Sequence, residues 1–542
     1  MIKKNNKIGI LYLCLVLLFP ALPILFTTFL SQDSMVSTQM KRLVFIIWGL
    51  SFFAILAFLF RPRPLLYLLI PVVFLACLEI YIVYIIRSAS EEGIIISVLE
   101  TNFREALEIV LANSLYLIAS IAYTGLYIYL LVKIPLTFRL ALKTKLLLIV
   151  IFLAVQGVII LRDFYIALKL PTSKSYLNFV SYAYSEKIQK TFPMNWLYNS
   201  IGYVRKKRQL SEYKKAIEGV SFYVKNQDSI HKRRVIVIVV GETARKHNFS
   251  IYGYGRETNP LLEQEPRLIQ MNNAETPYNN TMMAYTVFLS RATPDNFDQH
   301  LKEPSIIKAF SEAGFYTAYI SNQSLTYGTI YQAYAEQADT LLDLYTSMTM
   351  HSTDERIIPV FAETLQHFQD RDLCIIIHSI GSHFRYNLRY PKRFDHFTPS
   401  IGDDLDLAFI SEKQREELIN AYDNSILFTD YFLAELIDAL NKDTVSASLL
   451  MYASDHGENI FDDENKKFAH GGPNPSRFEL EIPLFFWRSE QYDQLFPEKV
   501  ENLKANRDKP VNTAHFFPTI LDLSGIVIES EGGMKSFAQP DF

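Results

Sequence analysis

Five apolar stretches constrain the fold of this chain more than any other feature, and they lie near residues 8–30, 43–60, 65–86, 113–133 and 145–161. About 20 helical residues cross ~30 Å of hydrocarbon, so each stretch is about long enough for one crossing. Backbone groups in lipid must pair within their own segment, which makes these stretches predicted transmembrane helices. The first lacks a convincing small-residue cleavage site and four more follow, so we predict a retained anchor rather than a signal peptide.

The positive charges beside these stretches predict the orientation of the chain. One set of flanking segments carries nine basic residues, whereas the opposite loops carry four, which are Lys41, Arg42, Arg87 and Arg104. Cytoplasmic loops hold the excess of Lys and Arg, so the N-terminus is predicted to be cytoplasmic. Five crossings then place everything after residue 161 outside the cytoplasm.

Composition excludes some classes of function. The net charge of −4, without a basic run interleaved with aromatics, gives no case for nucleic-acid binding. The three cysteines, Cys14, Cys77 and Cys374, lie in apolar runs and are expected to be small buried residues rather than disulfide partners. Residues 162–233 form a connector rich in Tyr, Lys and Arg. It is either a segment lying on the membrane surface or an ordinary solvated linker with short helices.

From residue 234 onward, strand-like apolar runs alternate with helical patterns such as 411–441. The runs are 234–240, 316–320, 373–377, 446–453 and 482–487. Alternation of this kind predicts an α/β sandwich around a largely parallel sheet.

Two of these predicted strands end in side chains that bind metals. Glu242 and Thr243 follow the β-branched run 235–241, and Asp455 and His456 follow the run 448–454. In open α/β sheets, ligands collect beyond the carboxyl ends of the strands. The four side chains are therefore a candidate cage for a divalent metal.

Further polar groups follow the other strands. The segment 279–290 contains threonines, and a hydroxyl beside a bound Zn²⁺ loses its proton more readily and becomes a nucleophile. His378, His383 and His470 are candidates for a second metal or for hydrogen bonds to phosphate oxygens.

A separate polar face lies between the third and fourth predicted spans. Ser97, Thr101 and Glu105 are four residues apart and so share one helical face. This face is either a pocket for a lipid head group at the outer membrane surface or a solvated face of a short loop helix.

Taken together, these motifs resemble one family, the membrane-bound phosphoethanolamine transferases of Gram-negative bacteria within the alkaline-phosphatase-like superfamily. The motifs that carry the resemblance are Gly241-Glu-Thr-Ala-Arg245, Gly253-Tyr-Gly-Arg256 with Thr258-Asn-Pro260, Ser321-Asn-Gln323, His378-Ser-Ile-Gly-Ser-His383, Tyr390-Pro391, Ser454-Asp-His-Gly-Glu458 and His470-Gly471. The resemblance implies five transmembrane helices (1–161), an interfacial connector (162–233) and a periplasmic alkaline-phosphatase-like α/β/α sandwich (234–542). It also implies a multi-pass protein of the bacterial inner membrane, which we expect to be a monomer.

The resemblance further implies a two-step transfer. A threonine attacks phosphatidylethanolamine and releases diacylglycerol, and the phosphoethanolamine then passes to an envelope glycolipid, either lipid A or the lipopolysaccharide core. The implied Zn²⁺ ligands are Glu242, Thr281, Asp455 and His456. His383 and His470 match histidines around the transferred phosphate and a second zinc. Ser97, Thr101 and Glu105 match the set that holds the ethanolamine end, although the family usually has Asn at the position of Ser97.

The nucleophile departs from the family pattern in one respect. Known members place it after a Cys-Gly pair, and here Asn279 and Asn280 stand instead. Thr281 keeps the family's separation from Glu242, so it is the predicted nucleophile. Thr243, Thr276 and Thr286 remain alternatives.

Four rival functions are weighed against this one. A sulfatase needs a Cys/Ser-x-Pro-x-Arg motif, which the chain lacks. A glycerol-phosphate or other glycan-modifying phosphotransferase shares the layout but is expected to have a different motif context. An inactive lipid-binding regulator would have lost ligands that are present here. A transporter is disfavoured because the predicted spans contain almost no ionisable residue apart from Glu79.

Overall fold

The computed structural model describes most of the chain and divides into two compact units between Arg205 and Lys206. Each unit is described here by itself. The described residues are 2–30, 39–59, 66–86, 89–90, 95, 114–134, 141–169, 176–226, 232–325, 330–345, 353–402, 412–464, 466, 468–470, 474–528, 535–540 and 542.

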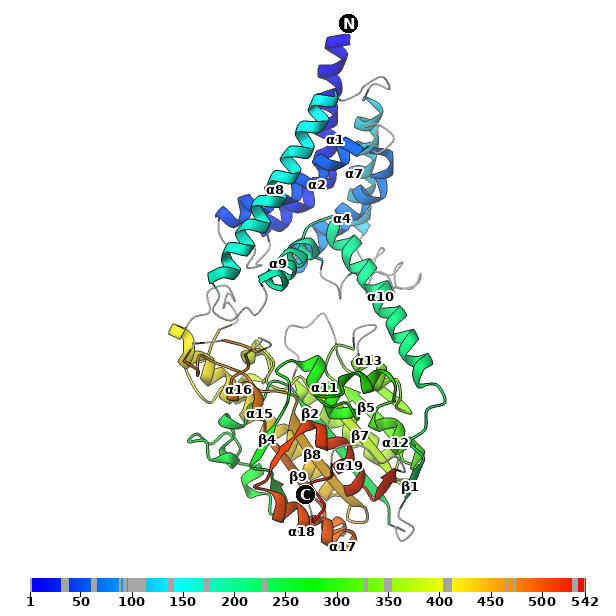
Figure 1. The fold of residues 1–542 in the computed structure, drawn as a ribbon, viewed down its shortest axis with the longest axis vertical. Helices are drawn as coiled ribbons and strands as arrows, with labels where there is room; N and C mark the ends of the chain where they lie inside the picture. The colour runs from blue at the N-terminus through cyan, green and yellow to red at the C-terminus, as the bar shows by residue number, and fades with distance from the viewer. Residues whose placement is uncertain are drawn as a thin grey trace. The chain divides into compact units, whose positions relative to one another are not determined.

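The first unit is helical, as the blue to cyan ribbon in Figure 1 shows. Its helices are α1 (Ile2–Leu30), α2 (Gln39–Leu59), α4 (Ile70–Ile86), α7 (Ser114–Val132), α8 (Leu142–Lys169), α9 (Tyr176–Lys190) and the beginning of α10 (Met194–Ile217). Each of the five predicted spans therefore contains a helix.

Only two of these helices, among the described residues, are long and apolar enough to cross a membrane, at Leu11–Leu30 and Leu142–Tyr165. The apolar parts of α2, α4 and α7 are shorter. At 1.5 Å per residue, the 17 residues of α4 extend about 25 Å, less than the ~30 Å of a typical hydrocarbon core. The prediction of five spans is thus matched in helix positions but not in helix length.

The predicted connector is largely helical. Helix α8 continues to Lys169, and α9 and α10 occupy most of the remaining residues up to Ile217. Cys77 and Cys374 are buried as expected, but Cys14 is exposed on α1, where burial was expected. All three cysteines are free thiols.

The second unit is built on a seven-stranded sheet of order β3-β9-β8-β2-β7-β5-β6. The pairs β9–β3 and β8–β9 are antiparallel and the remaining neighbours are parallel, in agreement with the prediction of a largely parallel sheet. The strands are β2 (Arg234–Gly241), β3 (Leu268–Gln270), β5 (Tyr316–Ser321), β6 (Thr340–Asp343), β7 (Leu373–His378), β8 (Ala447–Ser454) and β9 (Leu484–Arg488).

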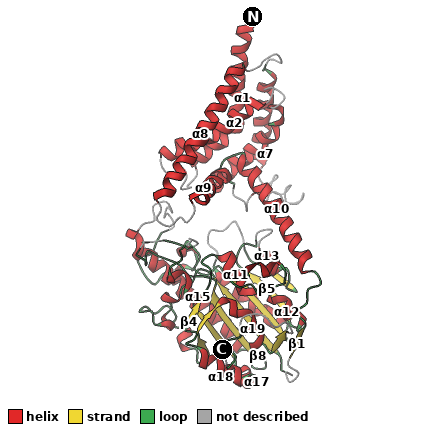
Figure 2. Cartoon of the chain, in the orientation of Figure 1, coloured by secondary structure: helices red, strands yellow, loops and turns green. Residues whose placement is uncertain are grey.

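Helices cover both faces of this sheet, as Figure 2 shows with the strands in yellow and the helices in red. Alternate residues of β2 point to opposite faces, so Ile236 and Ile238 enter one core and Val235 and Val237 enter the other. The first core is shared with α11 (Thr281–Leu289), α12 (Ile306–Glu312), α13 (Ile330–Ala335), α17 (Glu490–Leu495), α18 (Pro497–Asn506) and α19 (Phe516–Leu523). The second is shared with α14 (Ile357–His367) and α15 (Arg415–Asn441).

Small elements complete the unit. Strand β1 (Val224–Asn226) pairs with β11 (Ile526–Ile528), β4 (Asn273–Glu275) pairs with β10 (Pro510–Asn512), and α16 (Arg477–Leu480) precedes β9. The central β2 strand, fully buried along its length, positions the candidate site at its C-terminal end.

Candidate active site

The two metal-binding groups predicted from the sequence lie side by side. Strands β2 and β8 run parallel, with Gly241 opposite Ser454 at their carboxyl ends. Glu242 directly follows β2, and Asp455 and His456 directly follow β8, so the register brings the three side chains to one point. All three are almost completely buried.

Thr281 reaches the same point from the other side, as the first residue of α11. Its hydroxyl donates to Glu242 Oε1 at 3.1 Å and lies 3.2 Å from His456 Nε2. The side chain of Asn280 caps the helix by accepting from the backbone N–H of Met283 at 3.0 Å. Asn279, the residue before the cap, donates to Glu479 at 2.6 Å. The Asn-Asn pair therefore holds the turn that presents Thr281.

The geometry of the three buried side chains suits a metal ion. One ligand atom from each of Glu242, Asp455 and His456 lies within 4.8 Å of the others. His456 Nδ1 donates to the carbonyl of Gly457 at 2.8 Å, which leaves the Nε2 lone pair facing the two carboxylates. Asp455 Oδ1 accepts from two backbone N–H groups, whereas Oδ2 is buried and has no hydrogen-bond partner. A buried carboxylate oxygen without a hydrogen-bond partner is suited to bind a cation.

The electrostatics of the cluster lead to the same conclusion. Burial, reinforced by the nearby Asp455, raises the pKa of Glu242, and burial raises the pKa of Asp455 to about 7. Burial also lowers the pKa of His456, which favours the neutral imidazole. Two buried carboxylates beside a neutral imidazole and a hydroxyl are a costly arrangement without a cation. Oxygen and nitrogen donors in this number fit Zn²⁺.

Of the four candidate threonines, two reach Glu242. Thr243 donates to Glu242 Oε1 at 2.8 Å but is fully buried, whereas Thr281 is partly exposed. Thr276 and Thr286 instead donate to the backbone carbonyls of Tyr278 and Met282. Thr281 is the candidate whose hydroxyl both contacts the cluster and remains open to a substrate.

The two histidines predicted to surround the phosphate also lie at this end of the sheet. The His470 ring lies beside His456, with centroids 4.1 Å apart, and its Nδ1 contacts Glu458 Oε1 at 3.2 Å. Burial lowers the pKa of His470, but the bond to Glu458 outweighs this and the pKa rises to about 9. His383 Nδ1 donates to the carbonyl of Phe384 at 2.6 Å.

Sequence reasoning missed two contacts and one strained residue. Gln323 donates to Glu242 Oε2 at 2.9 Å, and Glu458 orients His470, although both residues lie within motifs that were recognised. Thr243 has φ of 60° in a non-glycine residue, a strained conformation of the kind that clusters at functional sites. No local sequence signal predicts either contact or the strain. The predicted head-group face of Ser97, Thr101 and Glu105 lies outside the described residues.

Replacing Gly381 with alanine is expected to displace Glu242. Gly381 has φ of +50°, and an added Cβ would lie 2.7 Å from the Glu242 carbonyl oxygen and 2.8 Å from its nitrogen. Since both are backbone atoms, relief requires moving the β2 end. We expect Gly381→Ala to lower the apparent midpoint of thermal unfolding and the bound zinc.

Gly314→Ala is the matched control for this substitution, because Gly314 has φ of +83° but nothing within 4 Å of an added Cβ. Gly314→Ala should lower the free energy of unfolding only through the unfavourable backbone conformation. Gly381→Ala should lower it by a further overpacking cost of about 1–3 kcal/mol. Equal effects of the two substitutions on unfolding and zinc content would contradict the assigned role of Gly381.

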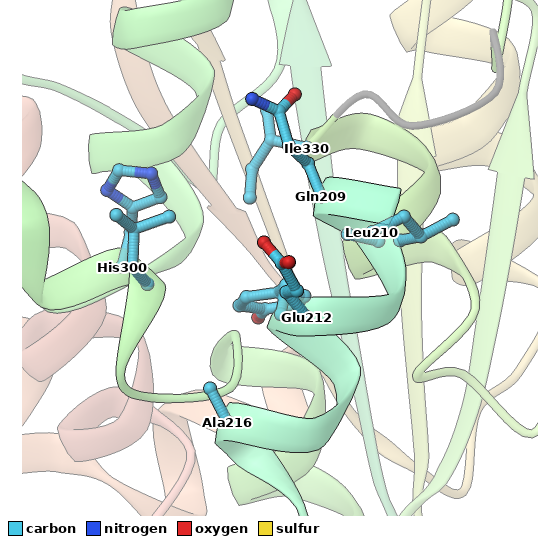
Figure 3. Close-up of a pocket in the computed structure, with 9 residues that line it drawn as sticks. Gln209, Leu210, Glu212, Ala216, His300 and Ile330 are labelled. Carbon is cyan, nitrogen blue, oxygen red and sulfur yellow. The ribbon is translucent and has the colours of Figure 1, made fainter. Parts of the chain in front are cut away.

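A separate pocket of about 460 Å³ lies between the second half of α10, the 3₁₀ helix Phe297–Leu301 and α13. His300 faces Glu212 and Ala216 of α10 across this pocket (Figure 3). No candidate site residue lines it, so it is not part of the cluster at the β2 and β8 ends.

Comparison with known proteins places this geometry in context. Residues 234–526 match the Sulfatase family model. A phosphoethanolamine transferase, EptC of Escherichia coli strain RS218, is 29% identical over 327 residues, covering 58% of this chain and 55% of the relative. The Kdo(2)-lipid A phosphoethanolamine 7''-transferase of Escherichia coli K12 is 28% identical over 315 residues, covering 55% and 53%. The chain thus spans about half the length of the curated relatives it matches.

Solved structures agree with these matches. The zinc complex of the C-terminal periplasmic domain of Escherichia coli EptC has a TM-score of 0.52 and 28% identity, covering 59% of this chain and 89% of that domain. The integral membrane lipooligosaccharide phosphoethanolamine transferase A of Neisseria meningitidis has a TM-score of 0.53 and 21% identity, covering 94% and 95%. This second likeness is one of fold, and it extends over the N-terminal helices as well.

Proposed function

Because the chain belongs to the sulfatase family, we propose that it transfers phosphoethanolamine from phosphatidylethanolamine to an envelope glycolipid, either lipid A or the lipopolysaccharide core. The named activity of the Escherichia coli relatives supports the transferred group. The sulfatase reaction itself is disfavoured, because the chain contains no Cys/Ser-x-Pro-x-Arg motif.

The observation that carries the proposal is the position of Thr281. Its hydroxyl lies 3.1 Å from Glu242 Oε1 and 3.2 Å from His456 Nε2, at the N-terminus of α11. The helix N-terminus favours negative charge, so it stabilises both a deprotonated hydroxyl and an incoming phosphate.

The residues that would hold a zinc ion are Glu242, Thr281, Asp455 and His456. When bound, zinc supplies positive charge that favours loss of the threonine proton and stabilises charge on phosphate oxygens. The orphaned Asp455 Oδ2 and the raised pKa of both carboxylates support this fit. The zinc complex of the EptC domain supports the choice of metal.

We infer a reaction in two displacements. Thr281 Oγ loses its proton and attacks the phosphorus of phosphatidylethanolamine. The bond from phosphorus to the diacylglycerol oxygen breaks, and that oxygen takes up the proton that Thr281 released. The product is a phosphoethanolamine ester of Thr281. An oxygen of the glycolipid acceptor then attacks the phosphorus and Thr281 Oγ leaves, regaining a proton. Splitting the transfer lets one site serve two bulky lipids in turn.

The remaining predicted site residues are proposed as substrate contacts. His383 and His470 are proposed to donate to phosphate oxygens or to bind a second metal. Their position near Glu242 and His456 supports this role. Ser97, Thr101 and Glu105 are proposed to hold the ethanolamine end, with Glu105 as the charge partner of the ammonium group.

We also propose the location and organisation of the protein. The likeness to an integral membrane transferase across 94% of the chain supports five spans, through α1, α2, α4, α7 and α8. The catalytic domain, residues 234–542, then lies in the periplasm of a Gram-negative bacterium and follows a connector of residues 162–233. The protein acts as a monomer in the inner membrane.

Mass spectrometry of lipopolysaccharide tests the proposed function. Cells that produce the protein should gain a species heavier by one phosphoethanolamine, and fragmentation should locate it on lipid A or on a core sugar. Cells that produce Thr281→Ala at equal abundance are the control. Identical spectra from the two strains would refute transfer to this glycolipid.

A further inference from the structure

A buried carboxylate in the first unit has no role in the mechanism above. Glu79 of α4 is completely buried. The apolar cluster around it includes Ala76, Ile82 and Trp196. An ionised carboxylate in such surroundings is costly unless it is compensated, and in a predicted membrane span it indicates function by default.

In the part of the chain that the structure describes, three groups donate to Glu79, and all three are uncharged. Oε1 accepts from the backbone N–H of Ser90 at 3.0 Å and from Asn195 Nδ2 at 3.1 Å, and Oε2 accepts from Trp196 Nε1 at 2.8 Å. This arrangement of three donors around two oxygens suits an ionised carboxylate, because such a group can accept hydrogen bonds but cannot donate one. Within the described ranges no Lys, Arg or His side chain forms an ion pair with it. The described residues therefore supply hydrogen bonds to the carboxylate but no opposite charge.

The same spot contains polar atoms without partners. Ser90 Oγ and Asn195 Oδ1 are buried and make no hydrogen bond, although the rest of each residue is held in place. The Asn195 amide bridges Glu79 and the Ser90 carbonyl, so the two residues are in direct contact. One turn further along α10, Asn199 Nδ2 is also buried and unpaired. Among the described residues, therefore, no positively charged donor reaches these two acceptor oxygens or the carboxylate beside them.

We propose that Glu79, Ser90 and Asn195 form a second binding site for a primary ammonium group, supplied by the ethanolamine head group of a phospholipid other than the donor molecule whose ammonium group is proposed to face Glu105. An ammonium has three N–H donors on one compact charge, which matches one carboxylate and two neutral oxygens. A quaternary ammonium has the charge but no N–H donor. The ammonium site is inferred from these contacts alone. Its assignment to an ethanolamine lipid rests on the proposed function.

Lipid retention by the full-length protein tests the site. The Thr281→Ala background prevents turnover, and native mass spectrometry compares bound phosphatidylethanolamine with phosphatidylcholine of identical acyl chains. We expect a preference of about tenfold for phosphatidylethanolamine, since its N–H donors are the difference. Glu79→Gln should lower this preference severalfold, and any preference that remains is assigned to the proposed donor contacts at Glu105.

Ser90→Ala is the decisive variant. It deletes an unpartnered hydroxyl and leaves the backbone N–H bond to Glu79 intact, so stability without lipid should stay equal or rise. Retention of phosphatidylethanolamine should nevertheless fall severalfold. Ser51→Ala, which removes a buried hydroxyl that donates to the Trp48 carbonyl, is the matched control and should lower stability without changing the lipid preference.

Each outcome decides between distinct explanations. If native mass spectrometry showed that free ethanolamine is retained as well as the lipid, the ligand would be a soluble amine, and the lipid assignment would be overturned. Displacement of the bound lipid by sodium ions alone would overturn the ammonium site. An unchanged lipid preference in both Glu79→Gln and Ser90→Ala would do the same, and Glu79 would then be a structural residue. A Glu79-dependent lipid preference in a protein that never modifies lipopolysaccharide would keep the site and refute the proposed function.

Discussion

Thr281→Ala is expected to lose donor cleavage by on the order of 10³-fold or more, the scale seen when a covalent nucleophile is removed. The fold and most of the zinc should remain, because Glu242, Asp455 and His456 still supply three ligands. The Thr281 side chain is partly exposed, so its truncation leaves no buried cavity. Release of diacylglycerol from phosphatidylethanolamine vesicles measures the loss.

Wild-type protein incubated with phosphatidylethanolamine and no acceptor should carry one phosphoethanolamine on the peptide that contains Thr281. Thr281→Ser keeps a hydroxyl and should retain part of the activity. Thr286→Ala, on the same helix with its hydroxyl bound to the Met282 carbonyl, is the control and should remain active. An adduct found on Thr243 would preserve the mechanism but refute Thr281 as the nucleophile, and diacylglycerol release without any adduct would refute the covalent route.

His456→Ala is expected to remove at least one equivalent of zinc and to abolish turnover. The ring supplies the only nitrogen within the three-residue cluster, and its Nδ1 bond to Gly457 fixes Nε2 toward the carboxylates. Elemental analysis of the purified protein measures the zinc. His367→Ala is the control, because that histidine lies exposed on α14. Full zinc occupancy in His456→Ala would contradict the assignment of the ligands.

A second ligand variant separates metal binding from stability. Burial raises the pKa of Asp455 from 3.8 to about 7, so the metal-free folded state holds a proton that the unfolded chain releases. Stability of the metal-free protein should therefore fall as pH rises between these values. Asp455→Asn should weaken this pH dependence and stabilise the metal-free form above pH 7, while preventing zinc binding. Thermal unfolding of the metal-free protein across this pH range measures the first effect, and elemental analysis measures the second.

The sequence was sufficient to predict the centre of the sheet and the location of the site. Long β-branched runs mark buried parallel strands, and parallel neighbours bring their carboxyl ends together, so Glu242 and Asp455 had to be close if β2 and β8 were adjacent. The edge strands β3 and β6 escaped prediction because three or four half-buried residues carry no period. The connector proved largely helical, although its composition had left a linker equally open.

Contacts between distant segments were beyond prediction for a different reason. Gln323 meets Glu242 only because β5 lies two strands from β2 in the sheet, an order that the chain sequence does not specify. The capping role of Asn280 agrees with its residue type, since Asn is a preferred N-cap, but the residue type alone does not show where the helix begins. Thr243 acquires its positive φ from surrounding contacts, not from any preference of its own.

The Asn-Asn pair before Thr281 has a consequence for the conditions in which this unit can fold. Asn280 holds the helix start by hydrogen bonding alone, and the unit from Lys206 onward contains one cysteine, the buried Cys374. Its assembly thus requires no oxidant, no thiol oxidase and no shuffling of mispaired bridges. A unit of this kind keeps its fold in the presence of reductants, whatever the redox state of its compartment, whereas proteins that rely on disulfides need an oxidising environment.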